Sequence, residues 1–70
     1  MNFSKAIKDI RKALNITQTE LADELSVSFS TVNRWENGKT VPNKMTIKMI
    51  MAFCEKNNIP FGYTITSTNA

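Results

Sequence analysis

Apolar residues recur at intervals of three and four positions in four stretches of this chain, which is the spacing of one face of an α-helix. The pattern predicts a first helix from Phe3 to Leu14, a second from about Gln18 to Leu25, a third from about Phe29 to Asn37 and a fourth from about Lys44 to Asn57. No internal repeat or low-complexity segment divides the chain. The sequence therefore predicts an all-α chain of short helices.

Capping residues mark where these helices begin. Thr17 and Glu20 form a T-x-x-E capping box, in which the hydroxyl and the carboxylate each satisfy a backbone amide that the helix leaves free. Ser28 and Asn43 are suited to cap the third and fourth helices, and Ser4 is a candidate cap for the first. The predicted boundaries therefore rest on local chemistry as well as on periodicity.

The helices end at residues that suit a turn. Asn15 follows the first helix, Ser26 takes the turn after the second, and Gly38 suits the left-handed conformation after the third. The second and third helices thus meet at a tight turn and share one apolar seam, formed by Leu21, Ala22, Leu25, Val27, Val32 and Trp35.

The fourth helix has a wider apolar arc than a solvated helix needs. Its inward residues are expected to be Ile47, Ile50, Met51, Phe53 and Cys54, and Met45, Met49 and Ala52 lie near or beyond the edge of that arc. Either the tail folds back over this helix or another subunit covers it. Residues 60–70, the tail, are expected to form either a short strand or a disordered end.

The outward face of the third helix differs from an ordinary solvated surface. It carries one aromatic ring, small polar groups and one guanidinium, with no carboxylate: Phe29, Ser30, Asn33, Arg34 and Asn37. The face is therefore a candidate binding surface.

The composition narrows the class of function. Nine Lys and Arg stand against six Asp and Glu in 70 residues, and the net charge of +3 favours a polyanionic partner. Because the chain has no histidine, and one thiol, Cys54, makes neither a zinc site nor an internal disulfide, we expect no enzyme, cofactor or metal. No apolar run approaches the ~20 residues of a membrane span, so we expect a cytoplasmic protein with no membrane partner. No small-molecule site is evident in the sequence.

Several of these residues together resemble the helix-turn-helix family of phage repressors and Cro proteins, also called the xenobiotic-response-element family. The resemblance spans about residues 3–59 and rests on Gln18, on the apolar seam, and on the run Trp35-Glu36-Asn37-Gly38-Lys39 followed by Pro42. It implies a compact bundle of four to five short helices, a lambda-repressor-like domain over residues 1–59. It also implies that the third helix lies in the major groove of double-stranded DNA.

The resemblance also assigns roles to individual positions. The residues that match base-facing positions are Phe29, Ser30, Asn33 and Arg34. Those that match positions near phosphates are Gln18, Ser28, Thr31 and Asn37, and Lys39, Lys44 and Lys48 are candidate phosphate contacts for which a solvated role is equally good. Arg11 and Glu36 match a pair that ties the first helix to the end of the third.

Two residues depart from the family pattern. Phe29 replaces a residue that is often polar, and its ring either touches a thymine methyl group or tucks back against the bundle. Ser26 stands where the family commonly has glycine, so a left-handed serine would cost on the order of 1 kcal/mol.

Two functions follow from the resemblance. The first is sequence-specific binding of double-stranded DNA by a small transcriptional regulator of the repressor kind. It would act as a homodimer through Met45, Met49 and Phe53, together with the tail from Ile59 to Ile65. The alternative is a protein-interaction module on the same fold, either the antitoxin partner of a toxin or the targeting domain of a larger enzyme. Its working surface would then be the acidic segment of Glu20, Asp23 and Glu24 together with the tail.

Overall fold

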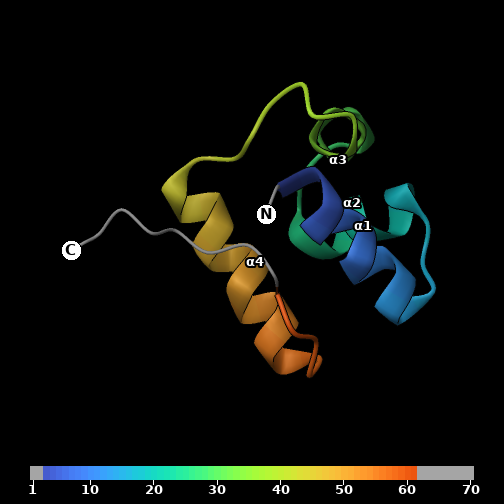
Figure 1. Ribbon diagram of the computed structural model, residues 1–70, viewed down its shortest axis with the longest axis vertical. Coiled ribbons are helices and arrows are strands. Elements are labelled where there is room, and N and C mark those ends of the chain that lie inside the picture. Colours follow the sequence, from blue (N-terminus) through green and yellow to red (C-terminus); the bar gives the residue numbers. More distant parts are fainter. Residues whose placement is uncertain (1–2, 62–70) are drawn as a thin grey trace.

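The computed structural model describes residues 3–61, and four helices occur within that range (Figure 1). They are α1 (Phe3–Leu14), α2 (Gln18–Leu25), α3 (Phe29–Glu36) and α4 (Lys44–Lys56). The predicted all-α helix-turn-helix fold is confirmed. The third and fourth helices each end one residue earlier than expected, with Asn37 and Asn57 as their C-terminal caps.

The helices pack around one apolar core. In Figure 1, α1, α2 and α3 gather together, and a connection over residues 37–43 leads to α4 beside them. Each helix contributes one side chain that has no exposed surface, namely Ile7, Leu21, Val32 and Ile50. Full burial of such a side chain stabilises a fold by about 1.5–3 kcal/mol. The seam between α2 and α3 therefore belongs to a core that all four helices share.

The rings of Phe3 and Trp35 connect the start of α1 to the end of α3. Their centroids lie 5.5 Å apart, and the planes cross at 86°, which is an edge-to-face arrangement. Such pairs contribute about 0.5–1.5 kcal/mol beyond the burial of their area. Trp35 is 3% exposed, so the prediction that it belongs to the apolar seam is confirmed.

Three of the predicted caps are confirmed. The hydroxyl of Thr17 accepts the amide hydrogen of Glu20, whose carboxylate accepts that of Thr17, and Ser28 and Asn43 cap α3 and α4. The prediction for Ser4 is wrong. Ser4 lies inside α1, and its hydroxyl donates to the backbone carbonyl of Glu36 at 2.6 Å. A partner far away in the sequence uses this hydroxyl, so it does not act as a local cap.

All four described helices end in the same way. The residue after the last turn has a positive φ, between 56° and 72°, and the next residue donates its N–H to the carbonyl five positions earlier at 2.8–3.1 Å. This hydrogen bond is the Schellman arrangement, which satisfies carbonyls that the helix leaves free. The four left-handed residues are Asn15, Ser26, Gly38 and Asn58. The first three were expected to take helix ends, and Asn58 was not foreseen.

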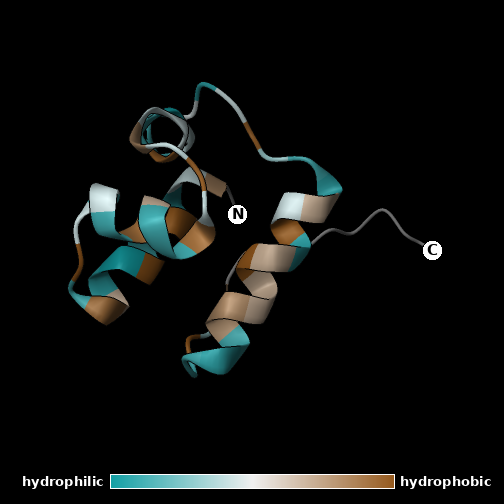
Figure 2. Cartoon of the chain, turned by 180° about the vertical axis from the view of Figure 1, so that it is seen from behind, coloured by the Kyte–Doolittle hydropathy of each residue, from teal (hydrophilic) through white to brown (hydrophobic). Residues whose placement is uncertain are grey.

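The outer face of α4 is more exposed than the sequence predicts. Met51 was expected to point inward, but it is 42% exposed, alongside Met45 at 73% and Met49 at 46%. The other residues expected to point inward are covered: Ile47, Ile50 and Cys54 are buried, and Phe53 is partly buried against the core. Figure 2 shows that apolar residues make up most of the middle of α4.

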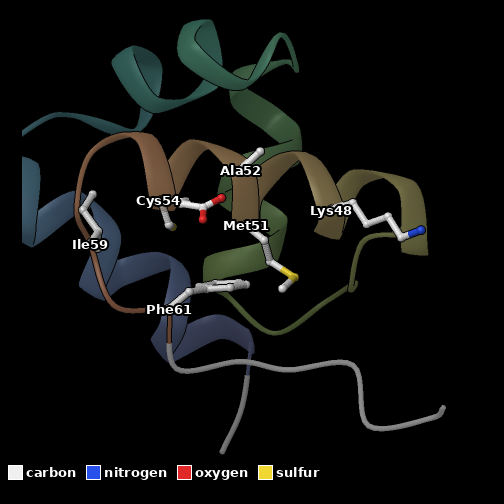
Figure 3. A pocket seen from close by; sticks show the side chains of 7 residues that line it. Lys48, Met51, Ala52, Cys54, Ile59 and Phe61 are labelled. Carbon is white, nitrogen blue, oxygen red and sulfur yellow. The ribbon is translucent and has the colours of Figure 1, made fainter. Parts of the chain in front are cut away.

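The chain that follows α4 covers part of this helix. Ile59 and Phe61 pack against the core and, with Met51, line an open groove along α4. Figure 3 shows the ring of Phe61 and the side chain of Met51 facing this groove, which Lys48 also lines. The expected strand or disordered end falls mostly on residues 62–70, which lie outside the described part of the chain. Among residues 3–61, no helix combines the length and the hydropathy needed to span a membrane.

Candidate nucleic-acid interface

The turn between α2 and α3 determines which side of α3 faces outward. Ser26 adopts φ 58° and ψ 41°, and the amide of Val27 donates to the carbonyl of Ala22 at 3.0 Å. Ser28 then begins α3 in an extended conformation. Because Val32 and Trp35 are buried against the other helices, the opposite side of α3 faces solvent.

The solvent side of α3 carries most of the residues expected to face bases. Phe29, Ser30 and Arg34 are exposed, and Asn33 is partly buried. Phe29 keeps 50% of its surface exposed, which does not fit a ring tucked against the bundle. Arg34 forms no ion pair with any carboxylate in residues 3–61, so its guanidinium is available to a ligand.

The residues expected near phosphates lie at the start of α2, at the start and after the end of α3, and in the first turns of α4. The hydroxyl of Ser28 accepts the backbone amide of Thr31 at 3.1 Å and lies 2.9 Å from the hydroxyl of Thr31. Lys39 follows α3, and Lys44 begins α4 after the connection; both side chains are exposed, as is that of Lys48. The lysines therefore remain candidates on exposure alone.

An ion pair holds the far end of α3 against α1. Arg11 donates to both carboxylate oxygens of Glu36, from Nε to Oε2 at 2.5 Å and from Nη2 to Oε1 at 3.0 Å. A third donor, Nη1, reaches the carbonyl of Ile16 at 3.2 Å, in the segment that leads into α2. Glu36 is 5% exposed and the side chain of Arg11 is 28% exposed. The pair expected from the family pattern thus joins three segments of the chain.

The surroundings of Glu36 keep its side chain charged. Burial by itself raises the pKa of Glu36, but the hydrogen bonds from Arg11 and Gln18, and the charges of Arg11 and Lys8, outweigh burial. The net pKa of Glu36 lies below its ordinary value. The same hydrogen bond raises the pKa of Arg11. Both groups are therefore ionised at neutral pH, and the pair has directional bonds as well as charge.

Polar contacts continue from this pair to the candidate base-reading residues. Gln18 donates from Nε2 to Oε1 of Glu36 at 3.0 Å and accepts at its own Oε1 from Nδ2 of Asn33 at 3.2 Å. Asn33 in turn accepts at Oδ1 from Nδ2 of Asn37 at 3.0 Å. We call this chain of side chains the polar network: Arg11, Glu36, Gln18, Asn33 and Asn37.

The sequence alone did not reveal the polar network beyond the pair of Arg11 and Glu36. Gln18 was expected to present its amide to a phosphate, yet both ends of that amide already have protein partners. Asn33 and Asn37 are four positions apart, which is the spacing of neighbouring side chains along a helix, so the sequence does contain a signal for the bond between them. The link from Gln18 to Asn33 depends on how α2 crosses α3, which no local pattern specifies.

The acidic side chains lie on a different part of the surface. Glu20, Asp23 and Glu24 are exposed on α2 and line a second pocket together with residues from the ends of α1 and α4. No residue of α3 lines that pocket. The candidate interface on α3 and the acidic surface are therefore separate.

Comparison with known proteins supports the family assignment. A family model described as helix-turn-helix matches residues 7–57. The HTH-type transcriptional activator BcrR of Enterococcus faecalis is 38% identical over 53 residues, which cover 76% of this chain and 26% of that protein. The cryptic phage CTXphi transcriptional repressor RstR of Vibrio cholerae serotype O1 is 33% identical over 42 residues, which cover 60% of this chain and 38% of that protein.

Similarity extends to a protein with a different activity. The type II methyltransferase M1.ScrFI of Lactococcus lactis subsp. cremoris is 46% identical over 56 residues, which cover 76% of this chain and 14% of that protein. No solved structure shows a significant match. The chain thus spans 14% to 38% of the length of these three relatives. Because the family model covers more than half of the chain, this protein belongs to the helix-turn-helix family of the phage repressor and Cro type.

Proposed function

We propose that this chain binds double-stranded DNA sequence-specifically and acts as a small transcriptional regulator of the repressor kind. The observation that carries the proposal is the solvent side of α3, where Phe29, Ser30 and Arg34 are exposed while the one carboxylate of the helix, Glu36, is buried in an ion pair. A surface without negative charge on an eight-residue helix suits the major groove, which admits one helix and exposes base edges. Relatives that carry the names of a transcriptional activator and a repressor agree with this function.

The proposal assigns a task to each part of the interface. Arg34 pairs with the O6 and N7 atoms of a guanine, and Asn33 pairs with an adenine, each worth about 1–3 kcal/mol of discrimination. Phe29 contacts a thymine methyl group, and Ser30 approaches a neighbouring base. Phosphate contacts come from Ser28, Thr31, Asn37, Lys39 and Lys44, with Gln18 near the backbone.

The protein acts as a homodimer in this proposal. One short recognition helix reaches few base pairs, and a second copy on an adjacent half-site raises specificity. The candidate surface for this contact consists of Met45 and Met49, which are exposed, and of Phe53, which is partly buried, together with the tail. The protein works in the cytoplasm, where the buried thiol of Cys54 stays reduced. We assign no catalytic step to the chain, because Asp23 and Glu24 are adjacent on α2 and project in different directions.

Selection of bound duplexes from a random pool, followed by titration of salt, tests the proposal. We expect one preferred sequence and an affinity that falls steeply as salt rises. Arg34→Ala should abolish the preference at one base pair and cost about 1–3 kcal/mol there. Lys44→Ala is the matched control, because it should weaken binding to every duplex alike. A chain that bound neither the selected nor a random duplex at about 50 mM salt would contradict the proposal.

A second function is supported by the methyltransferase relatives. The same domain can serve as the targeting unit of a larger enzyme, since this chain matches 14% of the length of M1.ScrFI. A protein-interaction role, such as the antitoxin partner of a toxin, would use the acidic surface of α2 instead of α3. Binding to duplex DNA that survives charge reversal at Glu24 but not loss of Arg34 favours the first two functions over the third.

A further inference from the structure

The bond between Gln18 and Asn33 gives Gln18 a role other than holding phosphate. We propose that Gln18 is a positioning residue that fixes the orientation of the Asn33 side-chain amide. In this way it determines the base preference at the position that Asn33 reads. This inference rests on the proposed function, because it names a specificity determinant within the same interface. It starts from the buried carboxylate of Glu36 and follows the polar network outward.

The carboxylate determines the orientation of Gln18. An ionised carboxylate has only acceptors, so the part of the Gln18 amide that faces Glu36 must be the donor, Nε2, at 3.0 Å. Glu36 is 5% exposed, and two hydrogen bonds from Arg11 hold its carboxylate in one orientation. The orientation of Gln18 is thus fixed by chemistry, because an inverted amide would place two acceptors together.

Gln18 then determines the orientation of Asn33. With Nε2 directed at Glu36, the remaining atom of the Gln18 amide is the acceptor Oε1, and the group of Asn33 at 3.2 Å must be the donor Nδ2. The Oδ1 atom of Asn33 accepts from Asn37 at 3.0 Å, which supports the same orientation. The order of donor and acceptor is therefore transmitted from Glu36, at the end of α3, through Gln18 on α2 to Asn33 on α3.

The Asn33 amide keeps the capacity to read a base in this state. Its nitrogen has a second hydrogen and its oxygen a second lone pair, which remain after the bonds to Gln18 and Asn37 are made. A bidentate contact with adenine needs a donor toward N7 and an acceptor toward N6 in a fixed order, and a flipped amide presents them reversed. Without these hydrogen bonds the Asn33 amide would sample both orientations. Fixing it in one orientation therefore increases discrimination between bases.

Two substitutions at position 18 separate this role from a phosphate contact. Gln18→Met keeps the length of the side chain but removes the donor to Glu36 and the amide acceptor for Asn33. The preference at the base pair read by Asn33 should then fall from about tenfold to about twofold while other positions keep theirs. Gln18→Glu keeps an acceptor for Asn33, so the preference should survive although all affinities fall because of the added negative charge. Gln18→Met decides the question, and loss of the preference at that base pair in a folded Gln18→Glu variant would contradict the inference even if Gln18→Met failed to fold.

The readout is selection from a random DNA pool with the full chain and with each variant. Asn33→Ala identifies the base pair concerned, and adding Gln18→Met to Asn33→Ala should cause no further loss of preference there. A uniform loss of affinity across all base pairs for Gln18→Met, or no change at the Asn33 position, would overturn the inference. If the unmodified chain selected no sequence, the proposed function itself would fail.

Discussion

The α3 side of the molecule and the outer face of α4 are built differently. Around α3, five polar side chains from three helices and one cap position bond in a continuous chain. The outer face of α4 exposes Met45, Met49 and Met51 instead. Hydrogen bonds depend on direction, so they hold a helix at one angle, whereas methionine is flexible and fits surfaces of several shapes. The contrast indicates that the angle of α3 is specified and that the outer face of α4 is adaptable.

The largest effect should come from breaking the polar network at its buried centre. Glu36→Gln removes the charge that Arg11 and Gln18 bind. The ion pair of Arg11 and Glu36 is intermediate in burial between an exposed pair and a fully buried pair. Exposed pairs contribute about 0–1 kcal/mol and breaking buried ones costs about 3–5 kcal/mol, so we expect a loss of about 2–3 kcal/mol. Urea unfolding measures this loss. Glu55→Gln, at an exposed position of α4, is the control and should stay within about 0.5 kcal/mol.

The loss caused by Glu36→Gln should depend on pH. Because the folded pKa of Glu36 lies below its ordinary value of about 4.3, the unfolded chain binds more protons in that range, and stability rises with pH. The stabilisation is complete above the unfolded pKa and is lost as pH falls through the folded pKa. The difference between wild type and Glu36→Gln should therefore shrink steadily below about pH 4. A difference that stayed constant from pH 7 to pH 3 would contradict the role of the charge.

An intermediate effect should come from the turns before and after α3, at Ser26 and Gly38. Gly38 and Ser26 have the same left-handed conformation, with φ of 72° and 58°, but only one of them is glycine. A Cβ on Gly38 would meet no atom within 4 Å, so Gly38→Ala tests the backbone alone and should cost about 1 kcal/mol. Ser26→Gly should stabilise the fold by a similar amount, measured by thermal unfolding. If both substitutions changed stability in the same direction, the account of these turns would fail.

The smallest effect on stability should come from the outer face of α4. Met49→Gln alters a side chain that is 46% exposed, and we expect a change within about 0.5 kcal/mol. If this face joins two copies, the same substitution should weaken self-association measured by sedimentation equilibrium. Thr40→Gln, in the exposed connection before α4, is the control. Unchanged association of Met49→Gln would exclude Met49 from the dimer contact.

Local signals accounted for most of the fold. The capping box at Thr17, the caps at Ser28 and Asn43, and the left-handed residues at three helix ends all depend on neighbours within a few positions, so the sequence could predict them. Which side of α3 faces solvent followed from the burial of Val32 and Trp35.

Features that depend on packing were missed or wrongly assigned. Ser4 resembles a cap in the sequence, but its partner is the carbonyl of Glu36, 32 positions away. Met51 has the right period for burial, but periodicity does not say how much of a face the neighbouring helices cover. The bond from Gln18 to Asn33 likewise depends on the crossing of α2 and α3. The exposure of Phe29, Ser30 and Arg34 on α3 could be predicted, whereas the hydrogen bond between Gln18 and Asn33 could not.

Backbone amide shifts of the ¹⁵N-labelled chain, measured during titration with its selected duplex, test whether α3 enters the major groove. If α3 enters the groove, we expect the largest shifts from Ser28 to Arg34 and at the start of α2 near Gln18, with small shifts along α4. Large shifts confined to the acidic surface of Glu20, Asp23 and Glu24, or to the methionines of α4, with α3 unchanged, would contradict it.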